Sequence, residues 1–210
     1  SIGLRRSRWD PFGVQHVMSA LRPASEHYAE AALAFAPDGT LHALLRAQPS
    51  NDVVHLRAAP GQTIATRTVL ASATEARITP QIAVDDDGQV FISWFAHATG
   101  EVRLGRRAEA SSPWTLVTAA TGLGADAQPQ LALTGTGRVL VSAYDASLNR
   151  VRVWSRVTRD DAATFELVMG TDANVAVPAH ALAGTPDGNP SLAYVRTGEQ
   201  GEQRVSQRFI

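Results

Sequence analysis

The chain has 210 residues, with 19 basic and 20 acidic side chains and a formal net charge of −1 at pH 7. This balance favours neither a nucleic-acid partner nor a membrane surface. No cysteine is present, which excludes disulfides and thiolate metal sites. All basic residues are arginine, which we interpret as the codon bias of a GC-rich, bacterial genome. The chain begins at Ser1 without Met or a signal peptide, which indicates a removed leader or a piece of a longer product.

Four similar stretches follow one another along the chain, and each has the pattern of a two-stranded hairpin. They are LAFAPDGTLHALLR (33–46), IAVDDDGQVFISWF (82–95), LALTGTGRVLVSAY (131–144) and HALAGTPDGNPSLAYVR (180–196). Their turn glycines, Gly39, Gly88, Gly137 and Gly188, lie 49, 49 and 51 residues apart. The alternation of apolar residues within each stretch predicts β-strands, and the recurrence of the stretches at a fixed interval predicts a repeated β-structure. No stretch keeps a helical period long enough for a helix of three turns.

Each period contains four short alternating segments, which is the size of one β-propeller blade. The predicted fold class is therefore all-β, a β-propeller of four-stranded antiparallel blades with a repeat of about 49 residues. The chain then divides into a partial blade, three whole blades and an incomplete blade, at 1–25, 26–74, 75–123, 124–172 and 173–210. A small residue at one place in each first strand predicts that this strand is innermost: Ala34, Ala83, Ala132 and Ala181.

This strand count leaves four to five blades without an obvious closure. The N-terminal fourth strand could join the last blade and close a four-bladed ring, with one outer strand left over. Alternatively, a second copy, a different chain or upstream sequence removed by proteolysis could complete a larger ring. Because open sheet edges invite aggregation, we expect completion by something outside these 210 residues.

The outer half of the third whole blade carries a family resemblance. The segment VRVWSRVTRDDAATFELV resembles the bacterial neuraminidase repeat, or Asp-box, with the pattern Ser/Thr-x-Asp-x-Gly-x-Thr-Trp/Phe. Thr158, Asp160, Thr164 and Phe165 match it, and Ala162 stands where the family has Gly. The resemblance implies a sialidase-like β-propeller over nearly the whole chain. It also implies that the Asp-box is a structural turn away from the active site, so Asp160 is not expected to be catalytic.

Loops that precede the innermost strands converge at one mouth of a propeller, where variable loops commonly hold a site. The candidate binding residues on these loops are Tyr28, Glu30, Glu75, Arg77, Asp126 and Gln128. The resemblance implies that arginines would bind a substrate carboxylate, a tyrosine assisted by a glutamate would be the nucleophile, and an aspartate the acid/base. The family's site needs three arginines, and only Arg77 stands at the matching depth. We therefore predict no catalytic residue.

Other kinds of site are disfavoured by spacing. The six histidines are dispersed, without a pair at ligand spacing, so no metal site or cofactor is expected. The aspartates at 85–87 are not kept in the other copies, which disfavours a calcium loop. His180 is interpreted as a core histidine with satisfied hydrogen bonds. The tryptophans are interpreted as core residues between blades rather than as sugar platforms: Trp9, Trp94, Trp114 and Trp154.

The loops joining second and third strands, at 47–52, 96–101, 145–150 and 197–202, are predicted at the same mouth. They are short and polar, without a long insertion that could build a deep pocket. This favours a non-catalytic sialidase-like propeller module that binds a glycan or a protein partner, or that acts as a scaffold in a larger assembly. The alternative is a glycoside hydrolase subunit whose remaining blades are missing from this chain. We expect an exported bacterial protein, possible completion of its ring by a second chain, and neither nucleic-acid binding nor membrane insertion.

Overall fold

The strands follow one another in four antiparallel sheets. The computed structural model describes residues 27–62, 66–72, 78–157, 164–172, 174–198 and 200–209. Within these ranges it contains fifteen strands and no helix. The predicted partial blade at 1–25 and residues 158–163 of the Asp-box segment lie outside the described residues.

Each sheet is built from strands that are consecutive in the sequence. The first contains β1 (His27–Phe35), β2 (Leu41–Gln48), β3 (Val53–Ala58) and β4 (Thr66–Ala71). The second contains β5 (Gln81–Val84), β6 (Val90–Ala96), β7 (Glu101–Arg107) and β8 (Thr115–Ala120). The third contains β9 (Gln130–Leu133), β10 (Arg138–Asp145), β11 (Arg150–Val157) and β12 (Glu166–Gly170), and the fourth β13 (Val175–Gly184), β14 (Pro190–Thr197) and β15 (Gln203–Phe209). We call these sheets blades 1 to 4.

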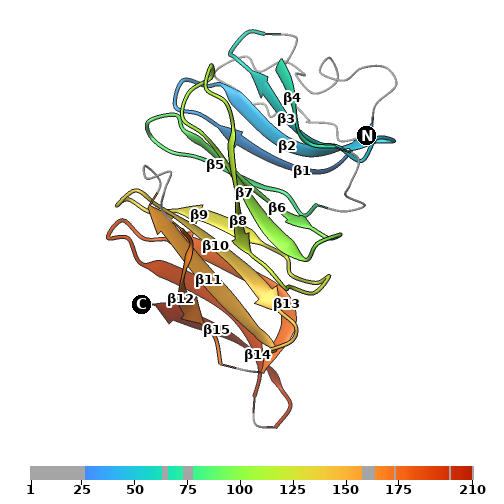
Figure 1. Cartoon of the computed structure of the whole chain (residues 1–210). Coiled ribbons are helices and arrows are strands. Elements are labelled where there is room, and N and C mark those ends of the chain that lie inside the picture. The colour runs from blue at the N-terminus through green and yellow to red at the C-terminus, as the bar shows by residue number, and fades with distance from the viewer. Residues whose placement is uncertain are drawn as a thin grey trace, which may run out of the picture.

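The blades are stacked face to face in an arc, from blade 1 in blue to blade 4 in red (Figure 1). The first strands form the inner side of this arc, since β5 packs between β1 and β9, and β9 packs between β5 and β13. Over the described residues the sheets do not close into a ring. The predicted all-β propeller architecture, with the first strand of each blade innermost, is confirmed.

Apolar side chains alternate along the second and third strands, so that each blade presents an apolar surface to both neighbours. Leu44 of blade 1 packs with Ile92 and Trp94 of blade 2. The other faces of β6 and β7 pack against blade 3, whose opposite face packs against blade 4. As predicted, Trp94, Trp114 and Trp154 lie in or against these layers between blades.

Blades 3 and 4 approach each other closely at the turn ends of their inner strands. The backbone N–H of Gly135 donates to the carbonyl of Thr185 at 3.3 Å. A Cβ added to Gly135 would lie 2.6 Å from the carbonyl oxygen of Pro186, and one added to Gly184 would overlap the carbonyl oxygen of Leu133. Glycine at both places therefore lets the two backbones meet without a side chain between them.

Candidate functional site

Three blades repeat the same backbone irregularity at the mouth end of their inner strands. Glu30, Thr79 and Gln128 occupy equivalent positions 49 residues apart, and their φ angles are 55°, 43° and 44°. A left-handed conformation is uncommon for residues other than glycine and costs free energy. A β-bulge is a structure that can impose it, and bulges commonly re-aim side chains beside functional sites. The repeated bulge therefore makes the mouth a candidate functional site.

Backbone hydrogen bonds show how the bulges arise. The N–H of Phe95 donates to the carbonyl of Ile78 at 2.8 Å, and the N–H of Tyr144 donates to the carbonyl of Ala127 at 2.7 Å. In each case the next residue is the one with positive φ. In blade 1 the pairing of β1 with β2 shifts register between Ala29 and Ala31, on either side of Glu30. The extra residue thus stands out of the ladder.

The Glu30 carboxylate ties blade 1 to blade 2. Its Oε2 accepts hydrogen bonds from the N–H groups of Ile78 at 2.6 Å and Thr79 at 3.0 Å. Its Oε1 lies 3.4 Å from Nη2 of Arg46, whose Nη1 donates to Oδ1 of Asn51 at 2.9 Å. The carboxylate is therefore engaged within the protein, and its predicted role in ligand binding stays a prediction.

The remaining predicted residues are spread over the blades. Tyr28 packs against the cluster that contains Ala47, on the face of blade 1 turned away from blade 2. Asp126 and Gln128 are exposed on the loop before β9 of blade 3. Glu75 and Arg77 lie outside the described residues. The structure thus brings Asp126 and Gln128 together on one loop, and a binding role for the six residues stays a prediction.

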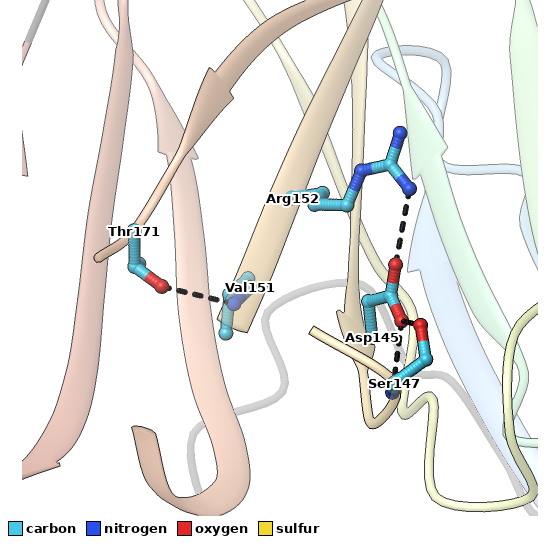
Figure 2. Close-up of polar contacts among 5 residues, drawn as sticks. All are labelled: Asp145, Ser147, Val151, Arg152 and Thr171. Carbon is cyan, nitrogen blue, oxygen red and sulfur yellow. Dashed lines mark hydrogen bonds and ion pairs between the residues drawn. The ribbon is translucent and has the colours of Figure 1, made fainter. Parts of the chain in front are cut away.

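The loop between β10 and β11 is braced by Asp145, whose side chain points into its own loop (Figure 2). Asp145 is 3% exposed. Its Oδ1 accepts from the N–H of Ser147 at 3.1 Å and from the Ser147 hydroxyl at 2.6 Å, while Oδ2 accepts from Nη1 of Arg152 at 3.0 Å. The Arg152 guanidinium also lies 5.0 Å from the ring centroid of Trp154. These contacts hold the loop in one conformation.

The same contacts set the ionisation of Asp145. Burial alone acts to raise the pKa of its carboxyl, but the hydrogen bonds from Ser147 and Arg152, with the positive charge of Arg152, lower the pKa below its ordinary value. The carboxylate is consequently ionised at neutral pH. Because its oxygens are already bonded, we assign it to bracing the loop and not to ligand binding.

The loop before β9 and the loop between β10 and β11 meet at the mouth of blade 3, joined by the bond from Tyr144 to Ala127. We call their polar residues, Asp126, Gln128, Tyr144, Ser147 and Asn149, the blade-3 mouth patch. The Tyr144 hydroxyl donates to Oδ1 of Asn149 at 2.9 Å. A phenol ring beside amide and hydroxyl groups suits a sugar, which stacks on aromatic faces and exchanges hydrogen bonds.

Sequence reasoning placed the 145–150 loop at the mouth but missed Tyr144 and Asn149 as candidates. The only signal for them was the position of that loop, because neither residue belongs to a motif.

His180 is accounted for by the fold. Its Nε2 lies 2.9 Å from the Ser142 hydroxyl, and its Nδ1 lies 2.8 Å from the carbonyl oxygen of Pro178. Burial lowers the pKa of His180, so its ring is neutral at pH 7. Both ring nitrogens of His180 therefore have partners, as predicted, and the side chain is half-buried rather than fully in the core.

The described part of the chain contains no cluster of three or more His, Cys, Asp or Glu side chains placed to hold a metal ion. It also contains no helix with the length and hydropathy needed to cross a membrane.

Comparison with known proteins places the fold. No protein-family model and no curated protein matches the sequence. Among solved structures, an α-L-arabinofuranosidase of Fusarium graminearum, Arb93A, is 14% identical with a TM-score of 0.55, covering 90% of this chain and 64% of that one. The NanB sialidase of Streptococcus pneumoniae is 12% identical with a TM-score of 0.54, covering 85% and 29%. The Hadza microbial sialidase Hz136 is 12% identical with a TM-score of 0.53, covering 86% and 44%.

The neighbours are β-propeller glycosidases. At these identities the likeness shows the fold alone. This chain spans less than two thirds of the length of each of the three neighbours.

Proposed function

We propose that this chain is a carbohydrate-binding propeller module of the sialidase-like, Asp-box type, without catalytic activity of its own. The observation that carries the proposal is the blade-3 mouth patch, an exposed set of hydrogen-bonding groups beside Tyr144 on loops braced by Asp145. The loops are short, which favours a shallow surface that binds one face of a glycan. Solved neighbours of the same fold are named as sialidases and arabinofuranosidases, which makes glycans the preferred ligand class.

The positions of two candidate residues favour binding over hydrolysis. Retaining glycoside hydrolysis needs a nucleophile and an acid/base on either side of one bond. Tyr28 packs on the face of blade 1 turned away from blade 2, and Glu30 is bonded to the backbone of blade 2. Neither is presented as a free group beside Asp126 on blade 3. The second candidate function, a glycoside hydrolase subunit, would require catalytic groups from blades outside this chain.

A glycan-binding measurement with variants of the patch tests the proposal. We expect the protein to bind glycans on an array, and Gln128→Ala and Asn149→Ala each to weaken that binding about three- to tenfold, the usual effect of one lost hydrogen bond. Gln207→Ala, which removes an exposed amide from β15, is the matched control and should bind normally. We expect no sugar release from the bound glycan. Release that Tyr28→Phe abolishes would overturn the non-catalytic role in favour of the hydrolase, and unchanged binding by both patch variants would exclude the patch.

We further propose that a second chain completes the ring and that the module acts outside the bacterial cytoplasm. The face of blade 4 turned away from blade 3 carries small and apolar side chains, including Ala181, Ala183 and Val205, and Val205 is 81% exposed. The facing sheets of blades 1 to 3 cover each other, and the outer face of blade 1 has a buried centre with Phe35 exposed at its end. An uncovered sheet face of this kind is a surface for association.

Native mass spectrometry tests this partner directly. We expect an assembly heavier than one chain, and the masses of its denatured components will tell a second copy from a different chain. Val205→Glu, which puts a charge on the apolar face, should reduce the assembly, whereas Leu167→Glu on β12 should leave it intact. A single-chain species at micromolar concentration, unchanged by Val205→Glu, would argue against a partner.

A further inference from the structure

A pocket of about 280 Å³ lies between blades 1 and 2, at the end opposite the mouth. It is bordered by the turns that join β1 to β2 and β5 to β6, and by the outer ends of β3 and β7. In Figure 1 these turns lie at the C-terminal ends of β1 and β5. The volume is at the lower end of small-molecule sites and suits a ligand of about monosaccharide size. No role at the mouth uses this pocket.

Two arginines that make no ion pair with another described residue line it. Arg107 is 6% exposed, lies 5.3 Å from the centroid of the Trp114 ring and has no partner for its Nε. Burial, and secondly the charge of Arg57, lower the pKa of Arg107, and both residues border the same pocket. In the described part of the chain, neither Arg57 nor Arg107 makes a hydrogen bond or an ion pair. Hydrogen bonds from Thr40, and to a lesser extent the charge of Arg57, lower the pKa of the Asp38 carboxyl, so Arg57 has one acidic neighbour at the rim. Arg107 is the more deeply buried of the two arginines, and a buried guanidinium gains most from a bonded anion, so the floor favours an anionic group.

A neutral histidine pair completes the floor. His42 lines the pocket, and its Nδ1 lies 3.1 Å from Nε2 of His55 behind it. His55 is fully buried, and its own Nδ1 has no partner. A bare lone pair is cheaper to bury than an unpaired N–H, so His55 is the donor to His42 through Nε2. In that tautomer His42 carries its proton on Nε2 and can donate it to a ligand.

The rim has the opposite charge. Asp38, Asp86, Asp87 and Glu109 are exposed and border the same pocket. Asp38 is oriented by hydrogen bonds from the N–H and hydroxyl of Thr40, at 2.8 Å and 2.9 Å. Carboxylates accept hydrogen bonds from hydroxyl groups, and they repel the more highly charged phosphate more strongly than a single carboxylate. A ligand that fits both the arginine-lined floor and the acidic rim has one carboxylate for the floor and several hydroxyl groups for the rim.

We propose that this pocket binds a monosaccharide-sized polyhydroxy carboxylic acid, such as a uronic acid. Its carboxylate lies against Arg57 and Arg107, the geometry for which guanidinium groups are suited, and its hydroxyl groups donate to the rim. This site is separate from the blade-3 mouth patch, so glycan binding at the mouth and acid binding here can each hold or fail alone.

The test is isothermal titration of the full chain with D-glucuronate, D-glucose and inorganic phosphate. We expect glucuronate to bind measurably more tightly than either of the others. Arg57→Gln and Arg107→Gln should each weaken glucuronate about tenfold, because each removes a charged hydrogen bond. Arg103→Gln, at the mouth end of β7 and paired with Glu101, is the matched control and should bind normally. Arg57 is only partly buried, so its variant keeps the test valid if Arg107→Gln fails to fold.

Each other outcome overturns the proposal. Equal binding of glucose and glucuronate would show that the arginines do not select the ligand, and tighter binding of phosphate would show a general anion site. Unchanged affinity in both arginine variants, or no binding of glucuronate, would remove the site altogether. Loss of glucuronate binding in Gln128→Ala alone would show that the acid binds at the mouth instead.

Discussion

Replacing Trp94 by alanine is expected to lower the free energy of unfolding by about 3–5 kcal/mol, the usual cost of emptying a buried aromatic site. Trp94 is fully buried on β6 and packs in the layer that contains Leu44 of blade 1. Since the blades are joined mainly by such layers, the cavity would weaken the contact between blades 1 and 2 as well as the sheet itself. This loss is a large share of the 5–15 kcal/mol that typically stabilises a domain.

Urea denaturation followed by circular dichroism measures this loss, with two comparison variants. Phe35→Ala removes an aromatic ring that is 55% exposed on β1 and should cost less than about 1 kcal/mol. Trp94→Phe should lose much less free energy of unfolding than Trp94→Ala, because it keeps most of the side-chain volume and removes an indole N–H that has no partner. Equal losses in Trp94→Ala and Phe35→Ala would contradict packing between blades as the main source of stability.

The fold was predictable because one period controls many positions at once. The alanines of the inner strands repeat every 49 residues and the turn glycines at intervals of 49, 49 and 51, so each copy supports the assignment of the others. Strand order then followed from side-chain size, since the axis of a propeller admits only small residues. The bulges at Glu30, Thr79 and Gln128 were not predictable in the same way. No glycine marks them, and the left-handed backbone is imposed by hydrogen bonds between strands.

The sites were much less predictable than the fold. Sequence predicted Glu30 as a binding residue at the mouth, but its partners in the structure are backbone groups of the next blade, 48 and 49 residues away, which carry no sequence signature. The pocket between blades depends on Arg57 and Arg107, which are 50 residues apart and lie in different blades. Neither belongs to a motif, and only the stacking of two sheets brings them together. These sites depend on packing between residues that are far apart in the sequence, whereas the repeat can be recognised from the pattern within each unit.

Stability is expected to fall steeply as the pH decreases from about 6.5 toward 4, because the His42–His55 pair resists protonation in the folded chain. Burial lowers the pKa of His42 to about 4 and that of His55 to about 3, from an ordinary value of 6.5. Between these values the unfolded chain binds protons that the folded chain does not. The stabilisation is therefore complete above pH 6.5 and is lost as the pH falls, by up to about 1.4 kcal/mol per pH unit for each histidine.

Urea titrations at pH 7.5, 6, 5 and 4.5 resolve this effect, and His55→Gln should flatten the profile because it removes the more deeply buried titrating ring. His27→Gln, at an exposed position on β1, is the control and should leave the slope unchanged. Some slope should persist in His55→Gln, since burial also lowers the pKa of His180. Asp145 does not confuse the result, because its lowered pKa removes stability only below its ordinary value of 3.8. A profile equally steep in His55→Gln and the unmodified chain would mean that the pair is protonated in the folded state. In that case the floor of the pocket would carry additional positive charge below pH 6.5, and glucuronate should then bind more tightly in acid.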